Sequence, residues 1–138
     1  MNIKRFLLAF ICALVFLFFW SWLYNGVLLK DAYADVQNLF RSREQMMSLF
    51  HWVVLGEAVL VLAFVLIYAS GFAGGGIPAG IRLGIMLELL AIGARMMIYA
   101  AQPFPGKLMV FWTLGGFVEM IGVGTIVGAI YPRREVGT

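Results

Sequence analysis

Apolar residues in this chain gather in four long runs, and most polar residues lie between them. The runs cover about residues 4–29, 50–70, 80–101 and 107–130. A helix needs about 20 consecutive, mainly apolar residues to cross the hydrocarbon core of a bilayer, and each run reaches that length. The pattern therefore predicts an all-α fold, a bundle of four transmembrane helices that forms a single transmembrane domain over residues 1–138.

Two kinds of connection separate these runs. Residues 71–78 and 102–106 are rich in glycine and proline, which predicts short breaks between helices. Residues 30–49 hold several charges, yet their apolar residues recur at helical spacing. We expect this segment to form a short amphipathic helix along the membrane surface, although an ordinary half-apolar connector has the same composition. Ser42 and Gln45 resemble a capping box, which predicts a helix start near Arg43.

The first run resembles a secretory signal peptide, because Lys4 and Arg5 precede its apolar stretch from Phe6 to Trp22 and Ala32-Tyr33-Ala34 has the small-x-small pattern of a cleavage site. Its apolar core is longer than the roughly 7–15 residues of a signal sequence, so we expect a retained span. The far end of the run carries aromatic residues typical of a membrane interface: Trp20, Trp22 and Tyr24.

The overall composition agrees with a membrane protein. Hydrophobic residues make up 63% of the chain and charged residues 12%, and the mean hydropathy is +0.96. Soluble domains are nearer half apolar and a quarter charged. The net charge of +3 is small and does not indicate nucleic-acid binding. A single cysteine, Cys12, excludes an intrachain disulfide and a cysteine-based metal site.

Four charged residues fall deep inside the predicted spans, away from the ends: Glu57, Glu88, Arg95 and Glu119. Glu88 and Arg95 are seven residues apart, so they project from one face of their helix. Charged groups in hydrocarbon are costly unless they face protein or water, and we therefore expect a buried polar cluster. The estimated depths predict that Arg95 pairs with Glu57 and, as a second partner, with Glu119. Such a cluster serves equally well as a proton or ligand site and as a clasp that fixes helix packing.

Glycines indicate where helices approach closely. Gly80 and Gly84 lie on the same face as Glu88, and Gly124 and Gly128 form a GxxxG pair in the last span. We expect the last two helices to make the closest contact through these glycines.

The positively charged residues give a weak indication of orientation. Four spans place both termini on one side of the membrane, together with Lys4, Arg5, Arg82, Arg133 and Arg134. The opposite side would carry Lys30, Arg41, Arg43 and Lys107. Because cytoplasmic loops carry an excess of lysine and arginine, we expect cytoplasmic termini.

No known catalytic, cofactor or metal motif occurs in the sequence. The GxSxG, HExxH, P-loop and GxGxxG patterns are absent, and His51 is the only histidine. We therefore expect no catalytic, cofactor-binding or metal-binding residues.

Several short motifs resemble a family of small bacterial inner-membrane proteins that have four predicted spans and no assigned activity. These motifs are Gly26-Val27-Leu28-Leu29 with Tyr33, Leu39-Phe40-Arg41, Gln102-Pro103-Phe104-Pro105-Gly106-Lys107 and Val118-Glu119. The resemblance covers most of the chain and implies the topology and an inner-membrane location.

Two functions remain open from the sequence. The first is a non-catalytic accessory or stabilising subunit of a larger membrane complex, whose partners are the lipid bilayer and either other membrane proteins or further copies of itself. The alternative is a small proton-linked carrier or channel that works through Glu57, Glu88, Arg95 and Glu119.

Overall fold

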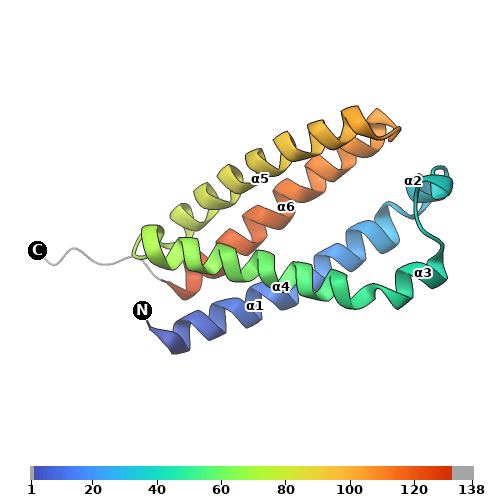
Figure 1. The fold of residues 1–138 in the computed structure, drawn as a ribbon. Helices are drawn as coiled ribbons and strands as arrows, with labels where there is room; N and C mark the ends of the chain where they lie inside the picture. Colours follow the sequence, from blue (N-terminus) through green and yellow to red (C-terminus); the bar gives the residue numbers. More distant parts are fainter. Residues whose placement is uncertain (1, 132–138) are drawn as a thin grey trace, which may run out of the picture.

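The computed structural model describes residues 2–131, and every element in that part of the chain is helical. Four helices are long and apolar enough to cross a membrane, as the sequence predicts: Ile3–Leu28, Phe50–Phe72, Gly76–Ala101 and Gly106–Ile130. The start of the first long helix and the end of the last lie together, beside the turn between the second and third (Figure 1). Arg133 and Arg134, which the orientation argument uses, lie outside the described residues.

The first two long helices end in wider π-helical turns. Helix α1 (Ile3–Ser21) continues as η1 (Trp22–Leu28), and α4 (Phe50–Ile67) continues as η3 (Tyr68–Phe72). Helix α5 (Gly76–Ala101) begins earlier than predicted and includes Pro78 in its first turn. Proline is tolerated there because the first backbone N–H groups of a helix have no intrahelical partner.

The segment expected to form one surface helix is divided into three short pieces. They are α2 (Lys30–Ala34), the single 3₁₀ turn η2 (Gln37–Leu39) and α3 (Arg43–Ser48). The capping box at the start of α3 is present, with Ser42 and Gln45 bonded reciprocally. A break at Leu49 separates α3 from α4, so the capped helix is not continuous with the second span.

Helices α5 and α6 (Gly106–Ile130) form an antiparallel pair with the most extensive contact in the molecule. Small residues spaced four apart meet along it, so that Gly76 faces Gly128 and Gly80 faces Gly124. A Cβ atom added at Gly80 or Gly124 would overlap the backbone of the other. The two backbones are therefore as close as glycine allows, the arrangement typical of small-xxx-small contacts.

Helix α1 packs against both α6 and α4, whereas α4 and α5 diverge from their shared turn (Figure 1). Near that turn the core is tightly filled by Val61, Phe64 and Val65 of α4 and by Tyr68 of η3, all fully buried. At the other end of the same two helices, residues 50–56 and 96–101 are all exposed. The molecule is thus closed at one end and open between α4 and α5 at the other.

Candidate functional site

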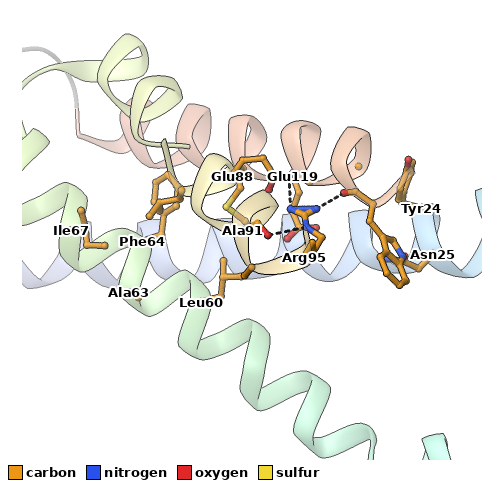
Figure 2. Close-up of a pocket in the computed structure, with 16 residues that line it drawn as sticks. Tyr24, Asn25, Leu60, Ala63, Phe64, Ile67, Glu88, Ala91, Arg95 and Glu119 are labelled. Carbon is orange, nitrogen blue, oxygen red and sulfur yellow. Dashed lines mark hydrogen bonds and ion pairs between the residues drawn. The ribbon is translucent and has the colours of Figure 1, made fainter. Parts of the chain in front are cut away.

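A cavity of about 520 Å³ lies where α4 and α5 begin to separate. We call it the central cavity. Helix α4 contributes an apolar wall that includes Leu60, Phe64 and Ile67. Polar side chains converge on it from the other three long helices, and Figure 2 shows several of them: Tyr24, Asn25, Glu88, Arg95 and Glu119. Apolar pockets with a few convergent polar groups are typical of ligand sites.

Glu88 lies on the face of α5 that packs against α6, in line with Gly80 and Gly84, and its side chain reaches the cavity from there. It follows Gly84 by about one helical turn, and its carboxylate contacts Gly116 of α6. A Cβ atom at Gly116 would overlap the carboxyl group, so this glycine provides the space that the group occupies. Glu88 is only 2% exposed, which makes it the one charged residue in the buried core of the described chain.

Arg95 holds this buried carboxylate and ties α5 to α6. Its Nη2 donates to Glu88 Oε1 and forms the only ion pair within residues 2–131. Its Nη1 donates to the Trp112 carbonyl oxygen at 2.9 Å, and its Nε donates to the Ala91 carbonyl oxygen at 3.3 Å (Figure 2). The prediction that Arg95 pairs with Glu57 is therefore wrong, because the seven-residue spacing brings Glu88 within reach on the same helix.

Glu119 lines the cavity without a partner of its own. No hydrogen bond or ion pair joins its carboxylate to any group of residues 2–131, although Glu57, Glu88 and Arg95 are near enough to influence its charge. The cavity thus contains two carboxylates and one guanidinium, and the guanidinium is engaged by Glu88. A carboxylate left unpaired in an apolar setting is costly, so this position requires a compensating group.

Glu57 does not line the cavity. It lies on α4 beside Ser21 of α1, and its Oε2 is buried without a hydrogen-bond partner in the described chain. The structure therefore brings Glu88, Arg95 and Glu119 into one cavity and leaves Glu57 at a neighbouring helix contact.

Aromatic residues cluster beside Trp112, which is part of the cavity lining. Trp112 donates its Nε1–H to the Tyr33 hydroxyl at 2.7 Å, and Tyr33 donates to Asn25 Oδ1 at 2.8 Å. The ring of Phe104 packs between those of Trp112 and Phe40, with centroid distances of 5.2 and 5.5 Å. Burial raises the pKa of Tyr33 above 10.0, so its hydroxyl remains a hydrogen-bond donor at neutral pH. Two segments that are distant in sequence, residues 25–40 and 104–112, meet here.

Several cavity residues were not predicted, including Tyr24, Trp112 and Gly116. Tyr24 was expected in an interfacial belt, but its hydroxyl donates to the Phe111 carbonyl oxygen of α6 at 2.7 Å. On α6 a helical signal was present, because Trp112, Gly116 and Glu119 follow one another at four- and three-residue spacing.

Neither the chemistry of metal sites nor known relatives identify this cavity. Within residues 2–131, no three histidine, cysteine, aspartate or glutamate side chains lie close enough to hold a metal ion. No protein-family model, curated protein or solved structure matches this chain.

Proposed function

We propose that this chain is a non-catalytic integral membrane protein that acts as a small proton-linked carrier. Its four long helices would form a bundle in the bacterial inner membrane with both termini in the cytoplasm, and α2 to α3 would lie at the opposite surface. The resemblance to the family of small inner-membrane proteins agrees with this topology.

The observation that carries the proposal is the unpaired Glu119 in a ligand-sized cavity. Ionisable groups inside a membrane protein that lack a fixed partner are typical of proton and ion pathways. Arg95 is less suited to that role, because its guanidinium is held by Glu88 and by two backbone carbonyl groups. We assign it, with Glu88, to keeping α5 and α6 in register.

The asymmetric packing of the bundle also supports a carrier. A carrier exposes its binding site to one side of the membrane at a time, and here the cavity lies where α4 and α5 diverge, away from the packed core at their shared turn. The opposite end is closed by Tyr68, which donates to the Gly76 carbonyl oxygen at 2.9 Å and packs against Tyr131 at 5.6 Å between ring centroids.

Proton movement into proteoliposomes tests the proposal. With a potassium diffusion potential and a trapped pH dye, the wild-type protein should move protons, because a carrier that returns empty with Glu119 as a carboxylate transfers net charge, and Glu119→Gln should abolish the movement. Glu44→Gln is the matched control, because Glu44 is an exposed carboxylate outside the four long helices. Equal rates for the wild type and Glu119→Gln, or no proton movement at all, would show that the chain is not such a carrier.

The second candidate is an accessory subunit of a larger membrane complex. The exposed half of α4 favours it, because residues 50–56 are all exposed in the described chain and leave a face for another membrane protein. Native mass measurement after mild solubilisation separates the two functions. A second membrane protein bound in fixed stoichiometry would favour the subunit, whereas multiples of 15.3 kDa alone would exclude it.

A further inference from the structure

The size of the central cavity matches a small molecule better than a transmembrane helix. Ligand pockets measure about 300–1,000 Å³, and this cavity measures about 520 Å³. A helix about 10 Å wide that crossed half of the hydrocarbon core would need roughly 1,200 Å³. The occupant is therefore more compact than a helix.

The polar groups of the cavity specify the charge of that occupant. The donors of Trp112 and Tyr24 are used within the chain, by the Tyr33 hydroxyl and the Phe111 carbonyl oxygen. Arg95 forms an ion pair with Glu88, so the charges of these two side chains compensate each other. The carboxylate of Glu119 then remains as a hydrogen-bond acceptor and gives the cavity an excess negative charge. A cationic group with N–H donors is the complement of this carboxylate.

The remaining walls specify an apolar body. Leu60, Phe64 and Ile67 of α4 face Leu87 of α5 and Met120 of α6 across the cavity. An alkyl chain lying along these side chains would bind about fourfold more tightly for each CH₂ group removed from water. Because α4 and α5 diverge, such a molecule has a route into the cavity from between these two helices.

We propose that the central cavity binds an amphiphilic alkylammonium cation, with its ammonium group on Glu119 and its alkyl chain against α4. This inference rests on the proposed carrier function and names its substrate class. When the cation enters, the carboxylic acid of Glu119 loses its proton to water at the open end, and the resulting carboxylate pairs with R–NH₃⁺. The reverse exchange releases the amine when a proton returns.

The charged groups around Glu119 are consistent with this exchange. Glu88 and Arg95 approach it from α5 and compensate each other, Glu57 approaches it from α4, and Tyr24 of α1 lines the same cavity. A proton or an ammonium group, but not both, neutralises the single excess charge. Lower pH should therefore weaken amine binding.

Titration calorimetry on the full chain in nanodiscs tests the assignment with octylamine and 1-octanol as probes, after subtraction of the heat for empty nanodiscs. A charge-assisted hydrogen bond contributes about 1.5–3 kcal/mol, so octylamine should bind about 10- to 150-fold more tightly than octanol. Glu119→Gln should remove this preference by weakening octylamine alone. Glu44→Gln, which removes an exposed carboxylate outside the four long helices, should retain it.

The outcomes separate this inference from the proposed function. Equal binding of octylamine and octanol to the wild type would overturn the alkylammonium assignment, even if Glu119-dependent proton movement were found. A Glu119-dependent preference without proton movement would keep the binding site and overturn the carrier. If Glu119→Gln does not fold, the wild type still decides the question, because a preference for octylamine that did not decline with falling pH would overturn the exchange.

Discussion

Replacing Gly124 by alanine tests how closely α5 and α6 approach. The added methyl group would meet backbone atoms of Gly80 and Ile81, which have no rotamer into which they could move. The two helices would have to separate along their whole contact. Gly93 of α5 provides the matched control, because a Cβ atom there meets nothing within 4 Å.

The expected magnitudes follow from two opposing effects. Overpacking a close contact costs about 1–3 kcal/mol, while alanine in place of glycine within a helix gains up to about 1 kcal/mol. The propensity gain is shared by both variants and cancels in their comparison. Gly124→Ala should therefore be about 1–3 kcal/mol less stable than Gly93→Ala, which itself should equal or exceed the wild type.

Reversible unfolding in mixed micelles, followed by the helical circular dichroism signal at increasing SDS content, measures this difference. The wild type and both variants should share one transition slope and differ in midpoint. If Gly124→Ala unfolded at the same midpoint as Gly93→Ala, the direct backbone contact between Gly80 and Gly124 would be refuted.

Three further predictions concern the polar groups. Arg95→Met should destabilise the protein by about 3–5 kcal/mol because it leaves Glu88 buried without a partner. The double variant Glu88→Leu/Arg95→Met should regain part of this loss in the same unfolding assay, and no recovery would contradict the pairing. Gly116→Ala should displace the Glu88 carboxylate and lower the unfolding midpoint, whereas a midpoint equal to the wild type would show that the space is not needed. Burial raises the pKa of Tyr33, so its contribution to stability should be full below about pH 10 and should decline as pH rises through the folded-state pKa; Tyr33→Phe should remove this alkaline loss, and an unchanged pH profile would refute the assignment.

The four long helices could be predicted from the sequence because each depends on a local property, a run of apolar residues of sufficient length. Boundaries were less certain where backbone geometry departs from a regular helix. Pro78 was expected in a loop, but it lies in the first turn of α5. The segment from 30 to 49 contains enough apolar residues for one helix, yet it is divided by η2 and by the break at Leu49.

The partner of Arg95 was the main error in the site. The depth estimate compared charges on different helices and treated them as equally near, but α4 diverges from α5 in the half that contains Glu57. Helix divergence is a tertiary property that spacing along one helix does not contain. The role of Gly116 could not be predicted for the same reason, because this glycine leaves space for the Glu88 carboxylate, which lies on another helix.

The ion pair of Glu88 and Arg95 has a consequence for how the protein enters a membrane. Both partners belong to α5, so this helix carries its own counter-charge and does not depend on another segment to neutralise it during insertion. Isolated charges at the centre of a helix hinder transfer from the translocon into lipid. A segment that leaves the translocon with its acid and base already joined meets a lower barrier, and α6 then needs only to supply its Trp112 carbonyl group to complete the arrangement.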